Sequence, residues 1–327
     1  MKRISIIGGG TGLSVLLRGL KKKTSDLHAI VNMVDDGGSS GKLRNELGMG
    51  PPGDLRNCLL AMSEADPLLE ELFNYRFDRG SLSGQSFGNL MIAALSELTG
   101  GIDHAIYQAA TIFNVTGHVY PVTLEDIHLY ARLENGREII GESTIPRIAF
   151  EESSPIEFVN LHPARPKAFK EVIPVLETSD IIIVGPGSLY TSLLPALLVS
   201  GIKEAILRSP GVCIYAANLM TQAGETDHLE LAEHLKVLQE HLEDNIFDGV
   251  VMNNRAVHFD ELRGYELEHA VQILPSPQDR LYFEENGIEV AEGDLICLKD
   301  GLVRHNFDAT ACAIMELSQQ IKDKRKQ

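Results

Sequence analysis

The sequence predicts an α/β protein built on a doubly wound, mainly parallel sheet with a small antiparallel β insertion. Short apolar runs alternate with amphipathic stretches along most of the 327 residues, which is the pattern of βαβ units. Most of these runs stop at Gly, Asp or Asn, residues typical of the carboxyl edge of such a sheet. Residues 118–165 break the alternation with a hairpin signal at Asn135-Gly136.

The first βαβ unit is expected at the N-terminus. Residues 4–7 are apolar and stop at glycines, as a buried parallel strand would. Residues 13–23 carry leucines on one helical face and three lysines at the end, where cations suit the helix dipole. Residues 28–34 read as a second strand that ends at Asp35 and Asp36. This order predicts a right-handed crossover between parallel strands.

A long loop is expected next. Residues 37–57 are rich in glycine, proline and polar residues, and a loop of this length in a compact protein is usually functional. Helices are expected at 58–75 and 87–115. Within the insertion at 118–165, β-type runs are expected at 127–133 and 138–140. Residues 1–117 and 166–327 are then expected to form one α/β domain around it.

The α/β alternation returns after Pro166. A clear buried strand at 180–184 ends in glycines, and two further strands each end at an asparagine. The expected elements are strands at 180–184, 212–216 and 247–252, shorter β-type runs at 272–274 and 295–298, helices at 189–200, 226–243 and 308–321, and a weaker element at 172–176.

Composition narrows the class of partner. The net charge of −17 argues against a broad nucleic-acid or anionic-membrane surface, although local amides and arginines can still hold a small anion. The four cysteines form no CxxC pair and read as reduced thiols of a cytosolic protein. We expect no signal peptide and no membrane span, and therefore a cytoplasmic location.

The segment Gly8-Gly9-Gly10-Thr11-Gly12 lies between an expected strand and an expected helix. Glycines there let backbone amides approach phosphate oxygens at a helix N-terminus. The segment departs from the dinucleotide fingerprint, because Leu13 occupies the place of its last glycine. It also lacks the GK[ST] of a Walker loop. We interpret it as a phosphate-binding turn; a plain strand-to-helix turn is the alternative.

Two polar segments follow. Asp35-Asp36-Gly37-Gly38-Ser39-Ser40-Gly41 offers carboxylates for a ribose or a divalent cation, with a solvated turn as the alternative. Pro51-Pro52-Gly53-Asp54-Leu55-Arg56-Asn57 carries a helix cap and an arginine suited to clamp phosphate, or is a simple helix start. Ser86-Phe87-Gly88-Asn89 has the same ambiguity.

Two segments in the second half complete the candidate site. Gly185-Pro186-Gly187-Ser188-Leu189-Tyr190-Thr191-Ser192 repeats the glycine-and-hydroxyl design of the first loop, so a second anion-binding helix start is expected. Asn218-Leu219-Met220-Thr221-Gln222-Ala223-Gly224-Glu225-Thr226 offers amide, hydroxyl and carboxylate groups for a sugar or a base edge. We find no GxSxG or HExxH motif, and assign neither catalytic residues nor a metal site.

Taken together, these motifs resemble the gluconeogenesis factor family (YvcK-like), the bacterial branch of the superfamily that contains 2-phospho-L-lactate transferase (CofD-like). The resemblance implies a Rossmann-like core and a nucleotide ligand. The transferase branch moves a phospholactyl group from a guanosine diphosphate-linked donor with Mg²⁺. The gluconeogenesis-factor branch binds UDP-sugars, notably UDP-N-acetylglucosamine, and supports cell-wall precursor supply and cell shape during gluconeogenic growth. The resemblance to this branch also implies that Tyr265 and Arg304 contact the ligand.

The leading hypothesis is a cytoplasmic regulatory protein that binds a UDP-sugar and acts through a protein partner. The first glycine loop holds the diphosphate, and Asp35 or Asp36 touches ribose or a metal. The expected ligand contacts are Gly8, Gly9, Gly10, Thr11, Gly12, Asp35, Asp36, Gly37, Gly38, Ser39, Ser40, Gly53, Asp54, Arg56, Asn57, Asn89, Gly185, Gly187, Ser188, Leu189, Asn218, Thr221, Gln222, Tyr265 and Arg304.

Two rival hypotheses stay open. One is a transferase that uses a nucleotide diphosphate-linked donor, with Mg²⁺ held by Asp35, Asp36 or Asp54. The other is an NAD-dependent oxidoreductase, which is disfavoured because the dinucleotide-binding fingerprint is incomplete. NAD could still occupy the same diphosphate site without redox chemistry. The sequence is also compatible with a homo-oligomer, and leaves the base, the sugar and the partner open.

Overall fold

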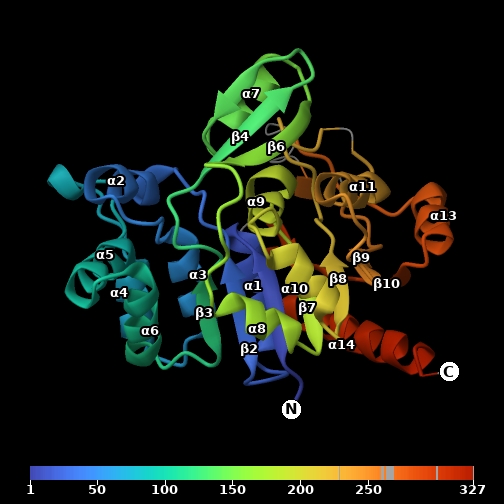
Figure 1. Cartoon of the computed structure of the whole chain (residues 1–327), viewed down its shortest axis with the longest axis horizontal. Helices are drawn as coiled ribbons and strands as arrows, with labels where there is room; N and C mark the ends of the chain where they lie inside the picture. The colour runs from blue at the N-terminus through green and yellow to red at the C-terminus, as the bar shows by residue number, and fades with distance from the viewer. Residues whose placement is uncertain (228, 259–260, 263–268, 300, 327) are drawn as a thin grey trace.

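The computed structural model of the chain describes residues 1–227, 229–258, 261–262, 269–299 and 301–326. These residues form a seven-stranded parallel sheet, a three-stranded antiparallel sheet and a two-stranded hairpin (Figure 1). In spatial order the main sheet contains β3 (His118–Pro121), β2 (Leu27–Val31), β1 (Ile4–Gly8), β7 (Ile181–Val184), β8 (Val212–Ala216), β9 (Gly249–Asn253) and β10 (Glu289–Gly293). The expected α/β class is confirmed.

The order of the parallel strands is that of a Rossmann-like sheet. Counted along the chain they run 3-2-1-4-5-6-7, with the order reversing between β1 and β7. Every residue of β1, β2, β7, β8 and β9 is buried, which explains why these strands are mostly apolar in the sequence, with only Ser5, His28 and Asn253 as polar exceptions. The edge strand β10 has no such run, because its residues are only partly covered, and the sequence pattern missed it.

Helices connect and cover the strands. The amphipathic helix α1 buries its leucines, and packs against α3 and the C-terminal helix α14. The helices are α1 (Gly10–Leu20), α2 (Gly38–Leu47), α3 (Gly53–Met62), α4 (Pro67–Asn74), α5 (Phe87–Thr99), α6 (Ile102–Ile112), α7 (Ile145–Glu151), α8 (Val172–Glu177), α9 (Leu194–Leu197), α10 (Ile202–Arg208), α11 (Leu231–Leu242), α13 (Pro277–Glu285) and α14 (Phe307–Lys324), with short turns η1 (Gly80–Leu82) and η2 (Leu189–Leu193).

Several expected helices have different limits in the structure. The expected loop at 37–57 contains α2 and the start of α3, because a polar, glycine-led helix shows no apolar stripe in the sequence. The helix expected at 58–75 is broken before Pro67, whose ring disfavours a helical residue ahead of it. The helix expected at 87–115 is interrupted at Gly100, which adopts a left-handed conformation at the end of α5.

Other elements also differ from expectation. The helix expected at 189–200 is the π-helical turn η2 followed by the short α9, and the weak element at 172–176 is α8. Helix α11 starts later than expected, at Leu231. The run at 272–274 contributes a single bridge, between Gln272 and Met220.

The small antiparallel sheet stands at the top of the view in Figure 1, with α7 beside it. It consists of β5 (Glu138–Ile140), β4 (His128–Leu133) and β6 (Ile156–His162), and Asn135-Gly136 forms the expected turn between β4 and β5. Strand β3 pairs with β2 in the main sheet, so the antiparallel part begins later than residue 118. A hairpin of β11 (Ile296–Lys299) and β12 (Leu302–His305) lies near the C-terminus, where a β-type run was expected.

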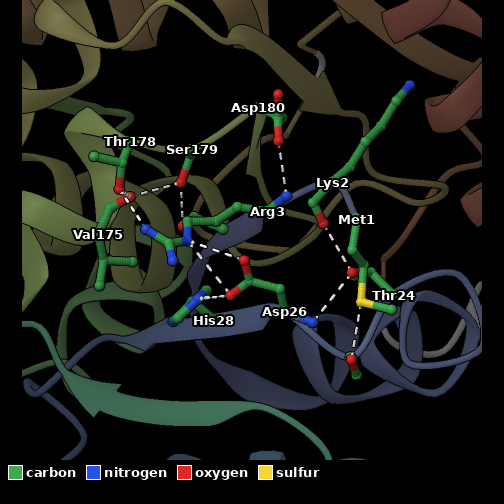
Figure 2. A network of polar contacts seen from close by, with 12 residues as sticks. Met1, Lys2, Arg3, Thr24, Asp26, His28, Val175, Thr178, Ser179 and Asp180 are labelled. Atoms are coloured by element: carbon green, nitrogen blue, oxygen red, sulfur yellow. Dashed lines mark hydrogen bonds and ion pairs between the residues drawn. The ribbon is translucent and has the colours of Figure 1, made fainter.

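The amino ends of three central strands are tied together around Arg3 (Figure 2). The backbone amide of Arg3 donates to Asp180 Oδ2 at 2.9 Å, and its guanidinium reaches Thr178 Oγ1 at 2.6 Å. Its Nε also donates to Asp26 Oδ2 at 3.2 Å, and Asp26 Oδ1 lies 2.7 Å from His28 Nε2. These contacts join β1, β2 and the start of β7 at the edge opposite to the glycine loops.

No helix in the described part of the chain combines the length and the apolar character needed to cross a bilayer.

Candidate functional site

The two glycine-rich turns meet where the strand order reverses. One turn follows β1 and the other follows β7, and these strands are neighbours in the sheet. Parallel α/β sheets bind ligands at this position, outside the carboxyl ends of the strands. The turns touch each other: a Cβ added at Gly12 would lie 2.8 Å from the carbonyl oxygen of Pro186. A glycine is therefore needed at position 12.

A cavity of about 470 Å³ opens beside these turns, within the range of small-molecule sites. We call it the glycine cavity. Its walls come from the turn after β1, the turn after β7, the segment after β8 and strand β12. It is lined by Gly9, Gly10, Thr11, Gly12, Val15, Pro186, Gly187, Ser188, Ser192, Asn218, Leu219, Met220, Thr221, Gln222, Ala223, Ala270, Val303, Arg304 and His305.

Negative side chains are absent from the described lining of the glycine cavity, although the protein carries a net charge of −17. No carboxylate is among the described residues that line it, and Arg304 supplies a positive charge. Helix α1 starts at Gly10 in the cavity wall, with no side-chain cap and no acidic residue in its first turn. The positive end of the helix dipole favours an anion there.

One amide of the first turn is already engaged. The backbone N–H of Gly10 donates to Asp54 Oδ2 at 2.7 Å, from the first turn of α3. Burial, and next the nearby charge of Asp35, raise the pKa of Asp54 to about 6. The Gly10 amide is thus directed to a carboxylate of the protein, while the turn backbone of Thr11 and Gly12 lines the cavity.

Three residues expected to contact the sugar or base are hydrogen-bonded to neighbouring parts of the protein. The amide of Asn218 donates to Gly187 O at 2.8 Å and accepts from Gly187 N at 3.1 Å. Gln222 Nε2 donates to Ser188 Oγ at 2.9 Å. Thr221 Oγ1 accepts from Val271 N at 2.8 Å. All three line the cavity, and these bonds fix the shape of its wall.

A second group of carboxyls lies near the turn, outside the glycine cavity. We call Asp35, Asp36, Asp54, Glu142 and Glu225 the acidic region. Asp36 Oδ1 accepts from the backbone N–H of Ser143, which brings the antiparallel unit against the end of β2. Burial, and next the charges of Asp35 and Asp36, raise the pKa of Glu142 to about 8.

The buried Glu225 connects the acidic region to η2. Its carboxylate accepts from Thr191 Oγ1 at 2.9 Å and from the backbone N–H of Tyr190 at 3.2 Å. Burial raises its pKa to about 7 despite these bonds. In the described part of the chain, no three or more His, Cys, Asp or Glu side chains are arranged to hold a metal ion.

Several other predicted residues lie around the N-termini of α2, α3 and α5 rather than in the cavity wall. The guanidinium of Arg56 donates to Ser86 Oγ and, at 2.8 Å, to Asn57 Oδ1. Ser39 Oγ donates to Gln85 Oε1 at 2.7 Å. The predicted residues outside the cavity lining are Gly8, Asp35, Asp36, Gly37, Gly38, Ser39, Ser40, Gly53, Asp54, Arg56, Asn57, Asn89, Gly185 and Leu189. Tyr265 lies outside the described residues.

Sequence reasoning missed three residues of this area. Glu142 follows the insertion strand β5, and its proximity to Asp35 depends on how the insertion folds back. Glu225 was part of a quoted motif but was not assigned to the ligand. His305 is next to Arg304 in the chain, and no motif marked it. In each case the informative signal, burial of a polar side chain, is absent from the sequence.

Known proteins resemble the chain over nearly its whole length. The family model described as 2-phospho-L-lactate transferase CofD matches residues 4–296. The chain is 43% identical over 316 residues to the gluconeogenesis factor of Bacillus subtilis (strain 168), which covers 96% of this chain and 98% of that protein. It is 40% identical over 316 residues to the gluconeogenesis factor of Halalkalibacterium halodurans, covering 96% of each.

A solved structure has the same fold. The crystal structure of a UPF0052 family member from Bacillus halodurans matches with a TM-score of 0.92 and 39% identity. The match covers 96% of this chain and 100% of that one. The parallel sheet and the turns that surround the glycine cavity are therefore part of a fold already observed experimentally.

Proposed function

We propose that this chain, which belongs to the 2-phospho-L-lactate transferase CofD family, binds a UDP-sugar and acts as a regulator of gluconeogenic growth. UDP-N-acetylglucosamine is the first candidate ligand. The names of the relatives, gluconeogenesis factor, support a role connected with gluconeogenesis. The regulator is proposed to work in the cytoplasm, through a protein partner, on cell-wall precursor supply and cell shape.

The observation that carries the proposal is the charge of the glycine cavity. An acidic protein would repel a diphosphate over most of its surface, yet the described lining of this cavity has no carboxylate. It offers instead the backbone of two glycine turns, the start of α1 and the guanidinium of Arg304. Such groups hold phosphate oxygens through backbone amides, the helix dipole and charge-assisted hydrogen bonds.

The remaining parts of the cavity fit the uncharged parts of a nucleotide-sugar. The segment after β8 presents polar groups at Thr221 and Gln222, beside the apolar Leu219 and Met220. This mixture is typical of small-molecule sites, in which a few placed polar groups set orientation within apolar walls. The exposed Arg304 lies at the cavity and is free to move onto a ligand.

Regulation requires that the ligand bind two states of the protein with different affinity. Asp54 suggests where such a difference could arise, because its carboxylate holds the Gly10 amide beside the cavity. A phosphate on the same turn would compete with that carboxylate or push it toward the acidic region. The protein partner would then bind differently to the two positions of α3.

The test is a calorimetric titration of the purified protein with UDP-N-acetylglucosamine, UDP-glucose, GDP and NAD. The proposal expects UDP-N-acetylglucosamine to bind most tightly, and unchanged compound to be recovered afterwards. Tighter binding of GDP would move the ligand assignment to the guanosine series. Retention of NAD without hydride transfer would mean that the glycine cavity binds diphosphate-containing compounds generally. Absence of binding by all four compounds would refute the proposal.

The description of the family favours one alternative function, a transferase with a nucleotide diphosphate-linked donor. That branch implies Mg²⁺, and the acidic region is where such an ion would be sought. The described carboxyls are not arranged as a metal site. Product analysis after incubation with UDP- and GDP-linked donors separates the two functions, since turnover would exclude a pure binder.

A further inference from the structure

His305 is a buried polar residue in the wall of the glycine cavity. It ends strand β12, opposite Ile296 of β11, and only 9% of it is exposed. Strand β12 alternates between the two sides of the hairpin: Val303 and His305 are buried, whereas Leu302 and Arg304 are exposed. The hairpin packs through Val303 and Ile296 onto Leu219, another lining residue, and so places His305 in the cavity wall.

The imidazole of His305 is not satisfied by the protein. Its Nδ1 atom is buried and finds no hydrogen-bond partner among the described residues. Buried polar atoms of native proteins are nearly always paired, and an unpaired one calls for an explanation. Nδ1 has almost no exposed surface, but His305 itself lines the cavity, so a bound ligand is the nearest source of a partner once the ring turns toward it.

The charge state of His305 limits what that partner can be. Burial lowers the pKa of His305 to about 4, so the ring is neutral at neutral pH. A neutral imidazole carries one N–H donor and one acceptor nitrogen, which suits a hydroxyl, a carbonyl or an amide. Phosphate oxygens are better matched by Arg304 and the start of α1, which carry positive charge or potential in the same cavity.

We propose that His305 is a specificity-determining residue of the glycine cavity, and that its imidazole hydrogen-bonds an uncharged polar group of the bound nucleotide-sugar. This inference rests on the proposed function and sharpens it. The two glycine turns and Arg304 retain the diphosphate, which many ligands share. His305 forms a hydrogen bond with a neutral group of the ligand, and nucleotide-sugars differ from one another in such groups.

The experiment compares two substitutions at this position by calorimetry with UDP-N-acetylglucosamine. His305→Phe keeps a ring but removes both nitrogens, and should weaken binding about tenfold, the typical effect of one lost hydrogen bond. His305→Asn places an amide near the position of Nδ1, and should recover most of the affinity. Thermal unfolding of both variants shows whether the hairpin remains folded.

A matched control lies outside the cavity. His234 on α11 is also fully buried, both its ring nitrogens lack a partner among the described residues, and burial likewise lowers its pKa to about 4. His234→Phe should leave the affinity unchanged. A general effect of losing a buried histidine would lower binding in both Phe variants and would overturn the assignment of His305.

Salt distinguishes a neutral contact from a phosphate contact. The loss caused by His305→Phe should be the same at low and high salt, because screening acts on charges. A loss that shrinks at high salt would overturn the neutral contact. If wild type binds and His305→Phe binds equally well, this inference fails while the proposed function stands. If wild type binds none of the four panel compounds, the proposed function fails and this inference with it.

Discussion

The glycine cavity and the acidic region lie near the same short turn and have opposite character. The cavity has no carboxylate in its described lining, whereas the acidic region gathers five carboxyls from the end of β2, α3, the segment after β5 and the segment after β8. Asp54 joins the two through its bond to the Gly10 amide. The contrast teaches that a protein of strongly negative charge can keep carboxylates out of the described lining of one cavity by confining the nearby acids behind the turn.

The largest expected effect comes from placing an acid in the cavity. Gly10 has φ +69°, and a Cβ there would have Ser192 Oγ as its nearest neighbour, at 3.9 Å. The side chain has room, and aspartate is one of the few residues that adopt a left-handed backbone, so Gly10→Asp should fold but repel a diphosphate. We expect calorimetry to show a loss of at least about 100-fold in affinity for UDP-N-acetylglucosamine, because an unpaired like charge costs several kcal/mol.

Gly10→Asn is the matched control, since asparagine tolerates a left-handed backbone and has nearly the shape of aspartate. It should bind more tightly than Gly10→Asp by about tenfold or more, the part of the effect that is due to charge. Equal affinities of the two variants would mean that negative charge is tolerated in the cavity. The contrast between the two regions would then have no functional meaning.

The next largest loss of affinity is expected when the positive side chain of the cavity is removed. Arg304→Ala should weaken binding about tenfold to 100-fold, the range for hydrogen bonds to charged groups. Arg304→Lys should restore part of the affinity, and both effects should shrink at high salt. Arg255, which pairs with Asp294 outside the cavity, provides the control. If Arg255→Ala weakens binding as much as Arg304→Ala does, Arg304 acts only through general surface charge.

The sequence predicted the parallel sheet well, because its central strands are buried on both faces and their isoleucines and valines form unbroken runs. It also predicted that strands ending in glycine lie at the carboxyl edge of that sheet, but not that the two glycine turns touch each other. The edge strand β10 and the polar helix α2 were missed, because partial burial leaves no periodic apolar pattern.

The division of the candidate site into two regions was not predictable from the sequence. Asp54 and Gly10 are far apart in the chain, and their hydrogen bond depends on how α3 packs against α1. The hydrogen bonds of Asn218 to Gly187 and of Arg56 to Ser86 likewise depend on partners that the fold brings near. Residue type showed which groups could bind a ligand, while tertiary contacts determine which of them are already engaged.

A smaller effect is expected on the free energy of unfolding when a carboxyl of the acidic region is replaced. The pKa of Glu142 is raised from 4.5 to about 8, so the folded protein holds a proton that the unfolded chain releases. The stabilisation is complete below pH 4.5 and is lost as the pH rises to 8. Glu142→Gln removes the ionisation, and should raise the free energy of unfolding at pH 8 by on the order of 1 kcal/mol or more.

Urea unfolding at pH 5 and pH 8 measures this effect. The stability of the wild-type protein should fall between the two pH values by more than that of Glu142→Gln. Glu46→Gln, an exposed change on α2, should follow the wild type. Ligand affinity should be unchanged in Glu142→Gln, since its side chain is not in the cavity lining. Parallel stability curves for the wild type and Glu142→Gln would show that this carboxyl is not held protonated.

The smallest expected effect concerns Mg²⁺. The described carboxyls are not arranged to hold a metal, and the described lining of the cavity has no carboxylate to bridge an ion to the diphosphate. Affinity for UDP-N-acetylglucosamine should thus agree within about twofold in EDTA and in Mg²⁺, because an ion that does not bind the complex cannot shift the equilibrium. A strong requirement for Mg²⁺ that Asp54→Asn abolishes would make the acidic region part of the ligand site. The two regions would then act as one, which is the arrangement that a transferase needs.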